Sequence, residues 1–116
     1  MRLTFVETVL FTKRVQELGL EAGLRGLQAA LMANPTQGDL DPGTGGLRKV
    51  RIPDAGRGKG KRGGARVHYL YLPHSALIYL LFVYGKDELI TLSAVQKKQL
   101  RRVVEAIRTE WEFRRR

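Results

Sequence analysis

The stretch that decides the fold prediction, residues 47–71, is LRKVRIPDAGRGKGKRGGARVHYLY. Its two ends have the apolar and aromatic pattern of strands, and glycine and basic residues dominate the loop between them. Residues 48–66 contain eight basic side chains against one acid, Asp54. Glycines let a backbone approach another surface closely, and the cations suit a partner rich in phosphate. We therefore expect a nucleic-acid partner, with single-stranded or ribosome-held RNA as the first candidate.

Length and composition predict a single soluble domain that comprises residues 1–116. The chain is 43% hydrophobic and 28% charged, as is usual for a globular protein. It has no apolar run of membrane-spanning length and no secretory-signal pattern, so we expect a cytoplasmic protein. It has no cysteine, which excludes disulfides, thiolate metal sites and a cysteine nucleophile. The net charge of +10 lies mainly in the central loop and the C-terminal segment, which favours a polyanion-binding face.

The order of the predicted elements is βααβββα, which indicates an α+β fold. Apolar periodicity predicts strands at 3–6, 47–52, 65–72 and 76–84, and helices at 8–18, 20–33 and from 93 to about 111. Thr8 is the expected N-cap of the first helix, and Ser93 with Gln96 forms a capping-box pattern before the last. Strand 76–84 is apolar on both faces and is expected inside the sheet. We expect an antiparallel sheet with the two N-terminal helices on one face, a C-terminal helix, and a basic tail over about residues 112–116.

Alternation along strand 65–72 places Arg66 and His68 on the same face, which we expect the N-terminal helices to leave open. This face of the sheet gathers the candidate catalytic residues, which are Lys49, Arg51, Arg66 and Lys86. The remaining candidate RNA contacts are Arg48, Arg57, Lys59, Lys61 and Arg62, with Tyr71 and Tyr84 as candidates for stacking on bases.

Basic residues of this kind are able to promote RNA cleavage without a metal. The 2′-hydroxyl attacks the adjacent phosphate, and fixed cations stabilise the developing negative charge. Each basic residue has a second interpretation as a phosphate contact with no part in bond breaking. His68 is either catalytic or a buried strand histidine with a hydrogen-bond partner. The sequence shows neither a convergent acidic cluster nor the GxxxxGK[ST] pattern, so we expect no metal and no cofactor.

Three motifs in this order resemble the RelE/HigB-like toxins of bacterial type II toxin–antitoxin systems, and the HigB branch in particular. They are GTGGLRKVR at 43–51, GRGKGKRGGARVHYLY at 56–71 and IYLLFVYGKDE at 78–88. The resemblance covers about residues 38–100, and the βααβββα order extends it across the chain. It differs from many relatives at Asp87, where those proteins have arginine, and no histidine follows His74 and no tyrosine follows Tyr84.

The resemblance implies a microbial-RNase-like fold and a ribosome-dependent mRNA endoribonuclease, or mRNA interferase, that inhibits translation. It implies two partners, a cognate antitoxin with a helix-turn-helix DNA-binding domain and mRNA on the 70S ribosome. Arg66 matches the arginine expected to hold the scissile phosphate, and Lys86 matches the lysine at the strand end. Lys49 and Arg51 match the basic second strand.

Two other function classes compete with the nuclease interpretation. A non-catalytic RNA- or ribosome-binding protein would use the same basic loop as an electrostatic anchor. A DNA-binding corepressor is less favoured, because the predicted helix pair at 8–33 joins through Gly19 and its second helix is unusually neutral. Cleavage of translated mRNA would separate the nuclease from both alternatives.

Overall fold

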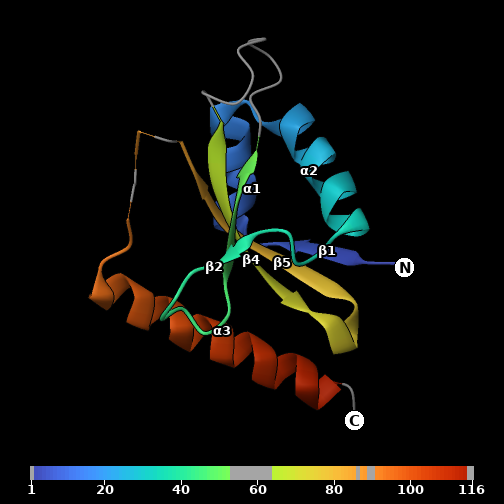
Figure 1. Cartoon of the computed structure of the whole chain (residues 1–116), viewed down its shortest axis with the longest axis vertical. Coiled ribbons are helices and arrows are strands. Elements are labelled where there is room, and N and C mark those ends of the chain that lie inside the picture. Colours follow the sequence, from blue (N-terminus) through green and yellow to red (C-terminus); the bar gives the residue numbers. More distant parts are fainter. Residues whose placement is uncertain (1, 53–63, 86, 89–90, 115–116) are drawn as a thin grey trace.

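The structure, a computed structural model, describes residues 2–52, 64–85, 87–88 and 91–114. It is an α+β fold with a five-stranded mixed sheet in the order β1-β5-β4-β3-β2 and a C-terminal helix (Figure 1). The strands are β1 (Thr4–Glu7), β2 (Asp39–Leu40), β3 (Arg48–Ile52), β4 (Ala65–Leu72) and β5 (Leu77–Tyr84). The helices are α1 (Val9–Leu18), α2 (Glu21–Ala33) and α3 (Ala94–Arg114), with a 3-10 turn at Pro73–Ser75. None of the described helices combines the length and apolar character needed to cross a membrane.

The pairing of the strands differs from the expected sheet in two places. β1 pairs with β5 in parallel, whereas the other neighbours are antiparallel. The expectation of a wholly antiparallel sheet is therefore wrong at β1, because two helices and three strands separate β1 from β5 and no hairpin fixes their relative direction. The short β2 also lies within the segment predicted as a loop at 35–46. β5 does lie inside the sheet, as its apolar sequence predicts.

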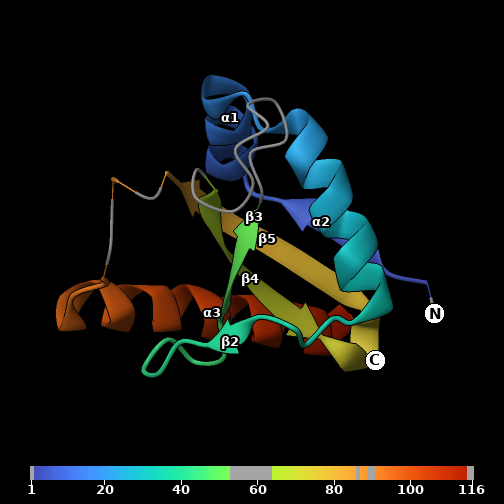
Figure 2. The same ribbon diagram turned by 45° about the horizontal axis from the view of Figure 1, so that its top comes forward.

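Helices cover both faces of the sheet, and each face has its own core. On the α1/α2 face, Phe11 and Leu31 pack with strand residues such as Val67. On the α3 face, Val104 packs with sheet leucines such as Leu70 and Leu81. Figure 2 shows α3 lying along one end of this second face. The face that the N-terminal helices leave open is thus covered at one end, and only the other end remains for a polar site.

Local signals in the sequence explain where the helices begin and end. The Thr8 hydroxyl accepts a hydrogen bond from the Phe11 amide at 3.0 Å, and this satisfies one free donor at the start of α1. Gly19 ends that helix in the left-handed region at φ 65°. Before α3, the Ser93 amide donates to the Gln96 side chain at 2.8 Å and the Gln96 amide donates to the Ser93 hydroxyl at 3.1 Å. Both predicted caps are confirmed.

A bulge in β5 explains how an almost continuous apolar strand serves two cores. Tyr69 pairs with Leu80 while His68 pairs with Phe82, so Leu81 has no cross-strand partner. Leu80 consequently packs in the α1/α2 core, and Leu81 packs in the α3 core. The extra residue shifts the alternation by one position, and Phe82 therefore projects from the α3 face.

Candidate functional site

Two cross-strand rows bring predicted site residues together on the α3 face. Arg66 of β4 pairs with Arg51 of β3 and with Tyr84 of β5. In the next row, His68 pairs with Lys49 and Phe82. Directly opposed residues of antiparallel strands project from the same face of a sheet. We call the set Lys49, Arg66, His68, Phe82 and Tyr84 the cation–aromatic cluster.

Aromatic stacking organises the middle of this cluster. The His68 and Phe82 rings are nearly parallel, with centroids 4.3 Å apart and an interplanar angle of 12°. Phe82 also stacks on Tyr84, with centroids 5.9 Å apart. His68 and Tyr84 are buried, whereas Phe82 keeps part of its ring exposed. The bulge at Leu81 is the reason that Phe82 and Tyr84 share this face with Arg66.

The Asp41 carboxylate is hydrogen-bonded to the buried His68. Its Oδ2 lies 3.1 Å from His68 Nε2, and its Oδ1 lies 3.2 Å from the Lys97 ammonium of α3. Burial lowers the pKa of His68, the Asp41 carboxylate opposes that decrease, and the positive charge of Lys49 adds to it. His68 is therefore neutral at physiological pH and donates its Nε2 proton to Asp41. Its Nδ1 is buried and has no hydrogen-bond partner among the residues that the structure describes.

This geometry favours one of the two interpretations of His68. The side chain is fully buried, so it does not contact a substrate at the surface of the cluster. It instead links β4 to α3 through Asp41 and Lys97. Burial also raises the pKa of Asp41, but the hydrogen bonds from His68 and Lys97 outweigh this effect and leave the pKa below its usual value. Asp41 therefore stays ionised, as its two partners require.

Arg66 is the cation that projects from β4 beside a phenol. Its Nη1 donates to the Gly64 carbonyl at 3.1 Å, and the side chain remains partly exposed. Burial raises the pKa of Tyr84, while the nearby positive charge of Arg66 opposes that increase. A fixed guanidinium next to a neutral hydroxyl is suited to binding a phosphate, because both groups donate hydrogen bonds to its oxygens.

The structure separates three other predicted residues from the cluster. Arg48 donates to the carbonyls of Thr36 and Gly38 at 3.0 and 2.7 Å, so its guanidinium stabilises a loop. Tyr71 packs against the α1/α2 core, on the opposite face from Tyr84. Arg51 shares the row of Arg66, but its side chain borders a hollow against α2. The five predicted site residues that lie outside the described residues are Arg57, Lys59, Lys61, Arg62 and Lys86.

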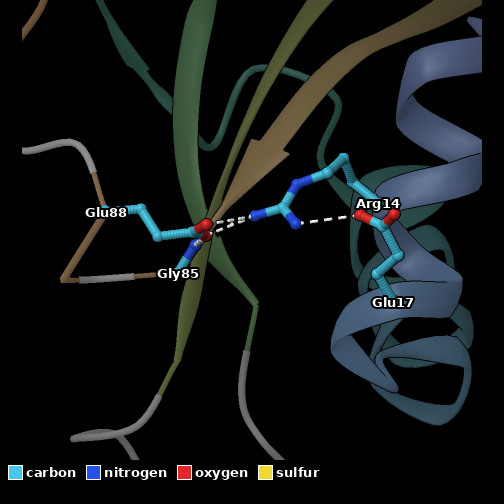
Figure 3. A network of polar contacts seen from close by, with 4 residues as sticks. All are labelled: Arg14, Glu17, Gly85 and Glu88. Atoms are coloured by element: carbon cyan, nitrogen blue, oxygen red, sulfur yellow. Dashed lines mark hydrogen bonds and ion pairs between the residues drawn. The ribbon is translucent and has the colours of Figure 1, made fainter.

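Figure 3 shows a second polar network at the end of β5 that the sequence did not predict. The Glu88 carboxylate accepts a hydrogen bond from the Gly85 amide at 2.6 Å and pairs with Arg14 of α1. Arg14 also pairs with Glu17 at 3.0 Å. The hydrogen bond from Gly85, followed by the side chain of Arg14, lowers the pKa of Glu88. This network ties the chain just beyond Tyr84 to the first helix.

Within the described ranges, no group of three or more histidine, cysteine or acidic residues is arranged to hold a metal ion. The cluster therefore offers cations and hydroxyl donors as its chemical groups. No protein-family model matches the chain.

Proposed function

We propose that this protein is an endoribonuclease that cleaves mRNA on the ribosome and so inhibits translation, as the toxin component of a type II toxin–antitoxin system. The observation that supports the proposal is the row formed by Arg66 and Tyr84, with Lys49 in the neighbouring row. These groups lie at one end of the sheet, and the α3 core lies at the other end. The net charge of +10 favours the approach of RNA to this surface.

In the proposed reaction, the 2′-hydroxyl of one nucleotide attacks the phosphorus of the following phosphate. The bond to the 5′-oxygen breaks, and a 2′,3′-cyclic phosphate and a free 5′-hydroxyl form. Arg66 and Lys49 stabilise the negative charge that develops on the phosphate oxygens. Tyr84 donates a hydrogen bond to one of those oxygens while its phenol remains neutral. The attacking hydroxyl loses its proton to solvent, and the departing 5′-oxygen takes up a proton from solvent to become the free hydroxyl.

One observation favours a second candidate, a non-catalytic RNA- or ribosome-binding protein. His68 is the histidine of the cluster, and it is neutral, buried and hydrogen-bonded to Asp41. The described part of the site therefore presents phosphate-binding groups without an accessible imidazole for proton transfer. Such a protein would bind RNA with a steep dependence on salt but would leave the message intact.

The nuclease proposal includes two macromolecular partners and a location. The substrate is mRNA held on the 70S ribosome in the cytoplasm. The inhibitor is an antitoxin encoded beside the toxin, with a helix-turn-helix domain that supplies operator binding. Neither α1 nor α2 adds a basic recognition surface, since the two helices together carry three basic residues against two acids. Operator binding is therefore assigned to the partner.

Primer extension on cellular mRNA after induced expression tests the proposal. We expect new 5′ ends confined to translated regions with the wild-type protein, and none with Arg66→Ala. Soluble expression and an unchanged circular dichroism spectrum would show that this variant is folded. Growth arrest without new 5′ ends would reject the nuclease proposal and support the RNA-binding alternative.

A further inference from the structure

The first half of α3 carries positive charge that the proposed reaction does not use. Residues 94–104 include no acid, and the first acid of the helix is Glu105. The basic side chains in this half are Lys97, Lys98, Arg101 and Arg102. At 3.6 residues per turn, the four lie within about 140° of the helix circumference. Lys97 is paired with Asp41, and we call the other three, which are exposed, the α3 basic patch.

Helix stability does not account for this arrangement. Lys97 and Arg101 are four residues apart, as are Lys98 and Arg102, and like charges at this spacing repel one another. The first turn of α3 has no acid, although the helix dipole favours negative charge there. Within the described residues, no ion pair engages a side chain of the α3 basic patch. Proteins break such local rules mainly at functional sites, so the patch is a candidate binding surface.

The α3 basic patch adjoins the cation–aromatic cluster. The Asp41 carboxylate lies between them, 3.1 Å from His68 Nε2 and 3.2 Å from Lys97 Nζ. The loop between β2 and β3 packs on the same part of the helix, where a Cβ on Gly45 would lie 3.1 Å from Arg101 Cγ (Figure 1). Because Lys97 neutralises Asp41, a polyanion bound at the cluster can continue onto α3 without meeting an unpaired carboxylate at this point.

We propose that the α3 basic patch binds the phosphate backbone of RNA and takes no part in bond breaking. Each patch cation is able to pair with a phosphate, and an arginine donates two parallel hydrogen bonds to it. Charge complementarity and continuity with the proposed phosphate site favour RNA over an acidic protein. The inference takes RNA as the partner from the proposed function, and it does not require cleavage.

The test compares RNA binding by two matched double variants. Lys98→Gln/Arg102→Gln removes two cations of the patch. The control, Lys13→Gln/Arg25→Gln, removes an exposed lysine and an exposed arginine from α1 and α2, on the other face of the sheet. The probe is a single-stranded 2′-O-methyl RNA of about 20 nucleotides, long enough to span an extended surface. It has no free 2′-hydroxyl, so fluorescence anisotropy measures its binding without cleavage.

We expect the patch variant to bind about 20-fold more weakly than wild type at 0.1 M salt, with the control unchanged. The slope of log K against log salt should become shallower by about 1.4, because each phosphate contact with a single strand contributes about 0.7. Circular dichroism checks that both variants are folded, and glutamine preserves helix propensity.

Four results would overturn the proposal. The first two are no binding of the probe by wild type and an unchanged slope in the patch variant. The third is an equal loss in the control, which would reduce the effect to overall net charge. The fourth is stronger competition by polyglutamate than by unlabelled RNA, which would assign the patch to an acidic protein. Absence of mRNA cleavage in cells would reject the nuclease alone, because the probe cannot be cleaved.

Discussion

Replacing Tyr69 by phenylalanine should destabilise the protein far more than the same change at Tyr79. Tyr69 is fully buried, and its hydroxyl donates to the Pro35 carbonyl at 2.8 Å and accepts from the Gly38 amide at 3.0 Å. Each hydrogen bond contributes about 0.5–1.5 kcal/mol, and the buried Gly38 amide would lose its hydroxyl partner. We therefore expect Tyr69→Phe to lower the free energy of unfolding by about 2–3 kcal/mol.

Tyr79→Phe is the matched control for this prediction. The Tyr79 hydroxyl accepts one hydrogen bond, from Trp111 Nε1 at 3.1 Å, and both side chains are partly exposed. Water replaces the lost partner, so the cost should stay below about 1 kcal/mol. Urea unfolding followed by circular dichroism measures both values, and calorimetry should show a decrease in Tm of about 10 °C for Tyr69→Phe. Equal losses in the two variants, or a loss at Tyr69 within about 0.5 kcal/mol of zero, would refute the reasoning.

Tyr69 should also make the stability of the protein decrease at alkaline pH. Burial raises the pKa of Tyr69 above its usual value of 10.0, and the hydrogen bond from Gly38 only partly opposes this. The folded state therefore keeps its proton at a pH where the unfolded state releases it. Its contribution to stability is complete below pH 10.0 and is lost as the pH rises through the folded-state pKa. The Tyr69→Phe variant should lack this pH dependence. The difference in unfolding free energy between wild type and variant should therefore decrease as the pH rises above 10.0.

Three further predictions concern the site and its surroundings. Arg66→Ala should reduce mRNA cleavage about 10²–10³-fold with little effect on Tm. Arg48→Ala loses two hydrogen bonds to carbonyls, so it should lower Tm and leave cleavage unchanged. Protonating the neutral, buried imidazole of His68 destabilises the folded state, so the free energy of unfolding should fall as the pH drops below 6.5. Denaturation series between pH 7 and 5 should show a smaller fall for His68→Phe. Gly46→Ala should cost about 1–3 kcal/mol in unfolding experiments, because its φ of +119° is strained for alanine and the new Cβ would lie 2.5 Å from a guanidinium nitrogen of α3.

The sequence was sufficient for the elements with local signals. The predicted strand 65–72 is β4 as observed, and the two predicted caps at Thr8 and Ser93 form the expected hydrogen bonds. These features depend on residues within one turn or on simple alternation, which a single sequence contains. The grouping of Lys49 with Arg66 on one face also follows from alternation once the strands are paired, whereas Tyr84 reaches that face only through the bulge at Leu81.

Long-range relations were not predictable in the same way. Asp41 and His68 are 27 positions apart, and no spacing rule connects them. The bulge at Leu81 reverses which face Phe82 occupies, and a continuous apolar run does not show where such an insertion lies. The two tyrosines chosen for base stacking accordingly project from opposite faces. The parallel pairing of β1 with β5 has the same origin, since it depends on how distant segments pack.

The position of α3 determines how much of the basic face an RNA can reach. The helix covers Leu70 and Leu81, and the covered part of the face ends near His68. The His68 imidazole stacks on the Phe82 ring and is hydrogen-bonded to the Asp41 carboxylate. Extending the cover over Arg66 would remove its guanidinium from water without supplying an anion, at a cost of several kcal/mol. The Asp41–Lys97 ion pair and the capping box at Ser93 together fix where the helix lies and where it starts. A neutral histidine suits this boundary, because it joins the dry core to the charged end while adding no positive charge beneath the proposed phosphate site.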